Sequence, residues 1–127
     1  MDALIQEFVG KRVWAVVGVS QERRKFGNIV FRDLRDAGYE VYGVHPDGHS
    51  IDGQPTYPTL AELPVKPEVV NLVVPPRVTE QIVRECHDLG LLRVWMQPGA
   101  ESPAAVAFCR EHGIAVVAGG PCAMVHK

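Results

Sequence analysis

The stretch with the clearest chemical potential is the turn from Gly18 to Gly27, which follows an apolar, valine-rich run and precedes a segment with helical spacing. Gly18 permits a tight turn, Ser20 offers a hydroxyl and an amide, and Gly27 opens a helix whose free amides and dipole favour an anion. Basic residues occupy positions 23–25 between them. The turn predicts a phosphate site, although it lacks the full three-glycine dinucleotide fingerprint. A turn without ligand and a merely solvated basic loop are the alternatives.

Glycine- or proline-rich residues also follow the other apolar runs of the chain. In an open parallel sheet, ligands bind beyond the carboxyl ends of the strands, where the strand order reverses. We therefore expect these positions to border the same site: His45 and Pro46; Val74, Pro75 and Pro76; Gln97, Pro98 and Gly99; and Gly119, Gly120, Pro121 and Cys122.

His45 bears on which nucleotide would bind, because NAD sites commonly place Asp or Glu at the end of the second strand to accept from ribose hydroxyls. A carboxylate would repel a phosphate, whereas an imidazole tolerates one. The position favours an adenosine with an additional ribose phosphate, as in coenzyme A or NADP. Asp47 keeps NAD as a minority alternative. A histidine hydrogen-bonded only to backbone is the structural alternative.

Other chemistries find little support in the sequence. It contains no Gly-x-Ser-x-Gly elbow, no His-Glu-x-x-His helix and no paired carboxylates. His45 and His49 are spaced for a shared metal on a helix, but Pro46 and Gly48 disfavour that geometry. Cys122 has no base near it in sequence. We therefore expect no catalytic residue and no metal site.

The elements that must position these residues alternate along the chain. Five short, valine-rich runs have the near-continuous hydrophobicity of strands covered on both faces. The segments between them show helical spacing and end in glycine. Such alternation predicts an α/β fold: a Rossmann-like, doubly wound parallel sheet of about five strands with helices on both faces. The expected strands are 12–19, 39–44, 68–74, 92–96 and 114–119, and the expected helices are 27–38, 79–90 and 102–113.

Residues 45–67 depart from this alternation. The segment contains five prolines and several turn signals, with room for a short helix near Thr59 to Leu63. We expect an ordered loop or a small additional hairpin. No domain boundary, repeat or low-complexity tract is evident, so residues 1–127 are predicted to form a single domain.

Composition limits the remaining classes of function. The chain has 13 Lys and Arg against 15 Asp and Glu, with no block of like charges, which gives no support to nucleic-acid or membrane-surface binding. It shows neither a signal peptide nor a run long enough to cross a bilayer, so we expect a soluble, cytoplasmic protein. The three scattered cysteines indicate reduced thiols, with Cys86 and Cys109 in the core.

The segment "VVGVSQERRKFGNIVFRDLRDAGYEVYGVHPDGHSIDGQPTYPTLAELP" closely resembles the start of small, stand-alone CoA-binding proteins. These are similar to the N-terminal CoA-binding domain of the succinyl-CoA synthetase alpha subunit. Shared features include Gly-x-Ser after the first strand, a residue-Pro pair after the second and the "YPTL" segment, and the resemblance extends from about Arg12 to His126. The chain departs from the usual pattern at His45, where Asn is usual, at Pro98, which interrupts Gln-Gly, and at Ala123 in the closing segment.

The resemblance implies a residue-by-residue site for coenzyme A. Phosphates would be surrounded by Gly18, Val19, Ser20, Lys25, Phe26 and Gly27; His45 and Pro46 would border the adenosine; Val74, Pro75 and Pro76 would line the pocket; and Gln97 and Gly99 would approach the pantetheine arm. In the synthetase, phosphoryl transfer uses a histidine of a further domain, which this chain is too short to include. The resemblance thus implies binding of CoA or an acyl-CoA without catalysis by this chain alone.

Two other hypotheses stay open from the residues themselves. One is an NAD(P)-binding redox enzyme or sensor that uses the same turn and sheet. The other is a regulatory protein whose pocket is vestigial and whose surface binds a protein partner.

Overall fold

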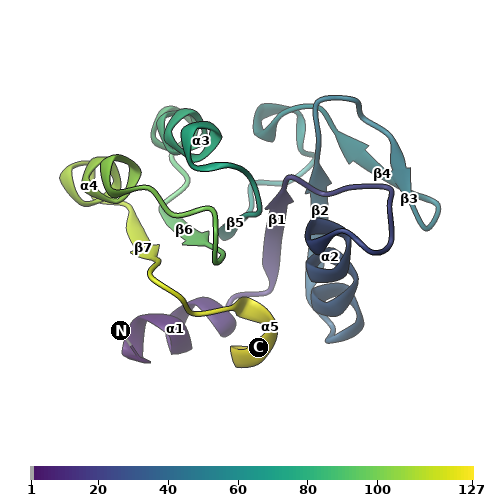
Figure 1. The fold of residues 1–127 in the computed structure, drawn as a ribbon, viewed down its shortest axis with the longest axis horizontal. Helices are drawn as coiled ribbons and strands as arrows, with labels where there is room; N and C mark the ends of the chain where they lie inside the picture. The colour runs from purple at the N-terminus through teal and green to yellow at the C-terminus, as the bar shows by residue number, and fades with distance from the viewer. Residues whose placement is uncertain (1) are drawn as a thin grey trace.

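The computed structural model describes residues 2–127, which form one seven-stranded sheet with helices on both faces (Figure 1). The strands follow the order β3-β4-β2-β1-β5-β6-β7 across the sheet. They are β1 (Val13–Val17), β2 (Glu40–Val44), β3 (Ser50–Ile51), β4 (Gln54–Tyr57), β5 (Val69–Leu72), β6 (Arg93–Met96) and β7 (Ala115–Val117). The helices are α1 (Asp2–Val9), α2 (Phe26–Asp36), the 3-10 turn η1 (Leu60–Glu62), α3 (Pro76–Leu89), α4 (Pro103–Glu111) and α5 (Ala123–His126).

Strand β1 lies at the centre and sets the topology. It pairs in parallel with β2 on one side and with β5 on the other. The chain builds outward from β1 through β2 to β4, and then returns to the far side of β1 for β5, β6 and β7. The order therefore reverses between β1 and β5, which confirms the predicted doubly wound α/β fold.

Two apolar layers hold the helices against the sheet. Side chains along β1 alternate, so that Trp14 and Val16 join the layer beneath α1, α2 and α5, while Ala15 and Val17 join the layer beneath α3 and α4. Figure 1 shows these two groups of helices on opposite faces. All four of these side chains are buried, as expected for a parallel sheet covered on both sides.

Helices α3 and α4 begin and end at residues that are typical of helix termini. Ser102 caps α4 by accepting a hydrogen bond from the Ala105 amide at 3.3 Å, and Pro103 occupies the first turn. Gly90 ends α3 in the left-handed conformation, with φ of 71°. Helix α3 begins at Pro76, three residues before the expected Thr79, because proline fits the first helical position.

The sheet is wider than the five strands expected from the sequence. Residues 45–67 contain the hairpin of β3 and β4 and the turn η1. Asp52 and Gly53 connect the hairpin with φ of 50° and 78°, the left-handed pair that tight hairpins require. β4 extends the parallel sheet beside β2, whereas β3 runs antiparallel at the edge.

Among the helices of residues 2–127, none has the length and apolar character to cross a membrane.

Candidate functional site

The carboxyl ends of four adjacent parallel strands bring most of the predicted site residues to one edge of the sheet. Gly18 follows β1, His45 follows β2, Val73 and Val74 follow β5, and Gln97 follows β6. Pairing continues to this edge, since the Gly18 amide donates to Val44 O at 3.0 Å and the Val73 amide donates to Val17 O at 2.9 Å. The crevice between β1 and β5 is thus bordered by Gly18 and Val73.

Gly18 and Gly27 allow the backbone to pack closely at this crevice. Gly18 has φ of 97°, and a Cβ there would lie 2.0 Å from the Val73 carbonyl oxygen. A Cβ on Gly27 would lie 2.2 Å from the Gly18 carbonyl oxygen. Gly27 therefore lets the first turn of α2 sit directly on the turn after β1, which is the helix-packing role of a glycine in nucleotide-binding folds.

The first turn of α2 presents backbone amides without partners. Lys25 is the N-cap residue, and no side chain caps the helix. The first intrahelical bond runs from the Ile29 amide to Lys25 O at 3.1 Å. Within the described residues 2–127, the amides of Phe26, Gly27 and Asn28 donate to no backbone or side-chain acceptor. The first turn of α2 also contains no acidic residue that would repel an anion.

The other long helices differ from α2 in this respect. At α4, Ser102 already satisfies one of the first amides. At α3, Pro76 lacks an amide, and the amides of Val78 and Thr79 both donate to Pro75 O. Helix α2 therefore offers the largest set of free amides at the carboxyl edge, at the position that follows the switch point.

Two side chains of α2 hold residues 18–27, the predicted phosphate turn, from behind. The Asn28 amide group donates to Ser20 O at 2.6 Å, and its carbonyl oxygen accepts from Arg32 Nε at 2.7 Å. Arg32 also donates from Nη2 to Arg23 O at 2.8 Å. Asn28 is only 1% exposed, so its bonds are shielded from water. Sequence reasoning missed both residues, because an Asn and an Arg four apart on a helix usually indicate only a solvated face.

A carboxylate on the β3–β4 hairpin holds the same turn from the side. Asp52 accepts from Arg23 Nη1 at 2.7 Å and from Arg35 Nη1 at 3.2 Å. The hydrogen bond from Arg23 is the main cause that lowers the pKa of Asp52 below its usual value, with Arg35 adding to it. The Gln21 amide group also donates to Ser50 O at 3.3 Å. The hairpin and the phosphate turn are therefore linked, as their proximity in Figure 1 also shows.

The basic part of the phosphate turn is open to solvent. Residues 22–25 line a surface cavity of about 520 Å³. The Lys25 side chain is 65% exposed and lies 3.5 Å from the Glu22 carboxylate. Ser20 Oγ accepts from the Glu22 amide at 3.1 Å, which leaves the Ser20 hydroxyl hydrogen free to donate. Val19, in contrast, has a fully buried side chain, so only its backbone faces the edge.

His45 lies beside this turn, at the end of β2. Its amide donates to Tyr57 O at 2.9 Å, and its Nδ1 accepts from the Asp47 amide at 3.1 Å. The side chain is 29% exposed. Pro46, next in the chain, is exposed. These bonds hold the His45 backbone and its Nδ1 in place and leave Nε2 without a partner among residues 2–127. A purely structural role for His45 therefore explains the position of the ring but not the free Nε2.

An apolar surface continues along the edge beyond the crevice. Val73, Val74 and Pro75 line a cavity of about 250 Å³ together with residues 98–100. Pro76 is exposed next to it. Gly99 has open space around its Cα and φ of 95°. Proline and valine walls of this kind suit an apolar, flexible chain better than a charged group.

Gln97 is at this edge but its side chain turns into the protein. It is fully buried, its Oε1 accepts from the Ala123 amide at 2.9 Å, and its Nε2 lies 3.2 Å from Cys122 Sγ. The side chain thus fixes the start of α5. Its backbone is bonded within the protein as well, since the Gln97 amide donates to Leu72 O at 3.1 Å and Gln97 O accepts from the Ala100 amide at 2.8 Å.

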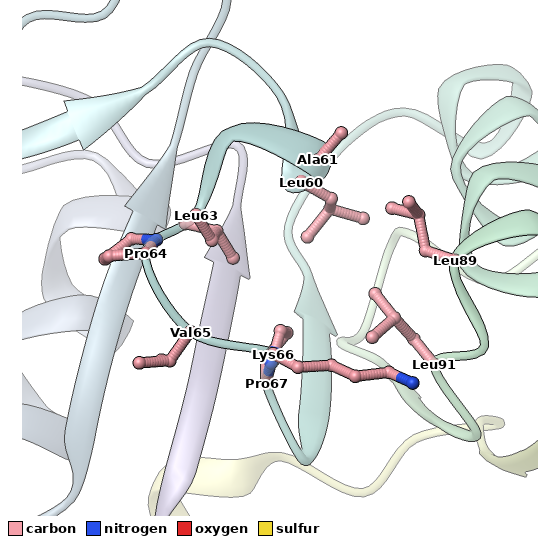
Figure 2. A pocket seen from close by; sticks show the side chains of 9 residues that line it. All are labelled: Leu60, Ala61, Leu63, Pro64, Val65, Lys66, Pro67, Leu89 and Leu91. Atoms are coloured by element: carbon pink, nitrogen blue, oxygen red, sulfur yellow. The ribbon is translucent and has the colours of Figure 1, made fainter.

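A second apolar cavity lies away from this edge. It has a volume of about 260 Å³ and is lined by residues of η1, the following segment and the end of α3, which Figure 2 shows around the opening. Pro67 precedes β5 and Leu91 precedes β6, so the cavity lies toward the amino ends of the strands. Lys66 is its single charged lining residue. The cavity lacks the free amides of α2 and does not suit several phosphates.

Two of the three cysteines lie in the core. Burial raises the pKa of Cys86 to about 12, with Cys109 and Glu85 adding to it, and burial raises the pKa of Cys109 to about 11. These two cysteines are core residues, as predicted. Within residues 2–127, no group of three or more His, Cys, Asp or Glu side chains is placed to hold a metal ion.

Fold and site together define a class: a doubly wound α/β protein with an uncapped helix N-terminus at its switch point. The family model of the CoA binding domain matches residues 12–127. The chain therefore belongs to the CoA-binding domain family. This finding confirms the family that the turn and the residues after β2 indicated.

Individual relatives agree with this assignment. The chain is 35% identical over 75 residues to an ADP-forming acetate–CoA ligase I of Archaeoglobus fulgidus, a match that covers 59% of this chain and 11% of the ligase. The chain spans between 11% and 20% of the length of the curated relatives it matches.

Solved structures of small proteins match over nearly their whole length. A conserved hypothetical protein from Pyrococcus furiosus is 38% identical with a TM-score of 0.86, and the match covers 91% of this chain and 99% of that one. A hypothetical protein from Pyrococcus horikoshii OT3 is 32% identical with a TM-score of 0.92, and the match covers 99% and 89%.

Proposed function

We propose that this chain binds coenzyme A or an acyl-CoA, with the pyrophosphate at the uncapped N-terminus of α2. The observation that carries the proposal is the set of partnerless amides at residues 26–28, seated by Gly27 on the turn after β1. Free amides and the helix dipole form an anion site, and Ser20 and Lys25 add a hydroxyl and a positive charge beside it. Membership of the CoA-binding domain family supports coenzyme A as the anion.

The rest of the cofactor would follow the edge of the sheet in both directions. The adenosine would lie beside His45 and Pro46, at the end of β2. The pantetheine arm would cross the switch point along residues 74–76 toward Gly99, where the apolar cavity lies. In this arrangement Gln97 contributes indirectly, because its side chain supports α5.

We propose binding without catalysis by the chain alone. The amides, the hydroxyl and the cations of residues 18–27 bind and orient a phosphate, and no hydrogen bond within residues 2–127 joins the Ser20 hydroxyl to a base. The relatives named as ligases are much longer than the matched region. A reaction would therefore need a protein partner that brings further groups.

All three cysteines are free thiols, which agrees with a cytoplasmic location.

Isothermal titration calorimetry with CoA tests this function. We expect a dissociation constant on the order of 1 μM, or about −8 kcal/mol. Lys25→Gln should weaken CoA binding several-fold, since it removes one cation from the phosphate turn. Lys11→Gln is the matched control, because Lys11 precedes β1 at the opposite edge of the sheet. Absence of binding at millimolar CoA would contradict the proposal.

NADP is the alternative that the same titration distinguishes. No carboxylate follows β2 directly, and an imidazole at that position is compatible with the ribose phosphate of NADP as well as that of CoA. Binding of NADPH with no competition from CoA would favour a redox enzyme or sensor instead.

A further inference from the structure

Two histidine rings face each other on the turn that follows β2. The ring centroids of His45 and His49 are 4.5 Å apart, and the ring planes are inclined by 35°. Nδ1 of His49 is buried and has no hydrogen-bond partner among residues 2–127. A buried ring nitrogen without a partner costs free energy, so packing alone does not explain why this ring is held here.

The backbone of β4 fixes both ends of this turn. The His45 amide donates to Tyr57 O at 2.9 Å, and the Thr56 amide donates to His49 O at 3.1 Å. Gly48 gives the turn between them its left-handed residue, with φ of 62°. The two imidazoles are thus brought together by the hairpin before any ligand arrives.

Hydrogen bonding leaves a donor of His45 available. Its Nδ1 accepts from the Asp47 amide at 3.1 Å, which assigns the hydrogen of the neutral ring to Nε2. The nearest recorded carboxylate is that of Asp47, with Oδ2 3.7 Å from Nδ1 and a side chain that is 78% exposed. On the neighbouring hairpin, β4 meets the turn through backbone groups and through the Thr56 hydroxyl, which donates to His49 O, and the Asp52 carboxylate is held by two arginines.

We propose that the imidazoles of His45 and His49 together bind the phosphate on the ribose of CoA and so select CoA over dephospho-CoA. The inference rests on the proposed function, which places the adenosine beside His45. A phosphate monoester carries close to two negative charges at neutral pH, and histidine is the side chain that gains its charge between pH 8 and 5. Two imidazolium rings at this spacing repel each other, and a dianion beside both rings offsets that repulsion.

Binding of CoA is therefore coupled to proton uptake. The bound phosphate favours the protonated imidazoles, and Nδ1–H of His45 then donates to the Asp47 carboxylate, 3.7 Å away, in place of accepting from the Asp47 amide. Protons are thus taken up from solution, and affinity rises as pH falls from 8 to 6.5. Dephospho-CoA lacks this group, and its affinity should change little across the same interval.

Calorimetry with both ligands at pH 6.5 and 8.0 tests the inference. At pH 6.5 we expect the wild-type chain to bind CoA at least about tenfold more tightly than dephospho-CoA. The preference should shrink at pH 8.0. Titrations in two buffers of different ionisation enthalpy should show proton uptake with CoA and less with dephospho-CoA.

Variants assign the effect to the two rings. His45→Gln combined with His49→Gln should abolish the preference for CoA over dephospho-CoA, with melting curves to confirm folding. His112→Gln, an exposed position after α4, is the control and should keep the preference. If the double variant does not fold, the test is made with His45→Gln and His49→Gln separately and with the proton uptake of the wild-type chain.

Two results would overturn the inference. One is equal affinity of the wild-type chain for CoA and dephospho-CoA, which leaves the proposed function standing. The other is an unchanged preference in the folded double variant. A wild-type chain that binds neither ligand would instead overturn the proposed function, and this inference with it.

Discussion

Asn28 shows how one buried amide can hold a functional turn. Its NH₂ group donates to Ser20 O and its carbonyl oxygen accepts from Arg32, so each end of the amide has a fixed role. Only Asn supplies a donor and an acceptor at this length. The conformation of the phosphate turn therefore depends on a residue that does not itself face the edge of the sheet.

We predict that Asn28→Asp lowers both stability and CoA affinity. The carboxylate still accepts from Arg32 but places an oxygen against Ser20 O, which loses its buried donor. The expected loss in free energy of unfolding is about 1–3 kcal/mol, measured by urea denaturation. Gln81→Glu adds the same charge on an exposed position of α3 and should change neither quantity by much. Unaltered CoA binding in a folded Asn28→Asp variant would show that the turn does not depend on this amide.

The three cysteines should differ in reactivity. Burial raises the pKa of Cys86 to about 12 and that of Cys109 to about 11, so at pH 8 both stay protonated as well as shielded. Cys122 is partly exposed. A thiol titration with an aromatic disulfide reagent at pH 8 should detect one rapidly reacting thiol in the native protein and three in guanidinium chloride. Rapid reaction of all three in the native state would contradict the packing described.

At the scale of elements, the contact between α2 and the turn after β1 depends on the absence of a side chain. We predict that Gly27→Ala destabilises the protein more than Gly38→Ala, although Gly38 has φ of 97°. Alanine at position 38 meets open space and adds backbone strain of about 1–2 kcal/mol. Alanine at position 27 meets the Gly18 carbonyl oxygen and must move α2. Equal melting temperatures of the two variants would argue against the close packing.

The link between the β3–β4 hairpin and the phosphate turn should respond to pH. Asp52 has a lowered pKa in the folded protein, so its contribution to stability is present above the unfolded pKa and disappears as pH falls through the folded value. Asp52→Asn should therefore lower Tm at pH 7 by a small amount and lower it less at pH 3. Asp88→Asn, at an 81% exposed carboxylate, is the control for a charge lost elsewhere. A decrease of equal size at both pH values would exclude the ion pairs as its cause.

Sequence periodicity was sufficient to predict the strands and helices that pack in the core. The valine-rich runs and glycine-terminated helices correspond to β1, β2, β5, β6, β7 and to α2, α3 and α4. Helix α1 was not expected, since it buries only Ile5 and Phe8 and has too few turns for a clear pattern. The four residues of α5 are ordered by a tertiary contact, the bond from the Ala123 amide to Gln97.

The site was predictable in part for a related reason. Its backbone positions follow from topology, because parallel strands deliver their carboxyl ends to one edge. The bonds of Asn28, Arg32 and Asp52 join residues whose proximity depends on how the hairpin folds over the turn. No local pattern encodes that arrangement.

At the scale of the whole molecule, the carboxyl and amino edges of the sheet carry different kinds of surface. The carboxyl edge carries the open N-terminus of α2, the histidine turn after β2 and the apolar wall after β5. The amino edge carries the apolar cavity of Figure 2, in which Lys66 is the single charged lining residue. An extended cofactor with a charged end and an apolar arm matches the carboxyl edge, because polar and apolar surfaces follow one another along that edge in the same order.

The most direct test of the central claim is a titration of the ¹⁵N-labelled protein with CoA, followed by amide chemical shifts in two-dimensional NMR. The account predicts that the amides of Phe26, Gly27 and Asn28 shift most, with smaller shifts at Gly18 and Ser20. Saturation with CoA that leaves residues 18–28 unmoved would contradict it, as would shifts confined to the cavity of Figure 2.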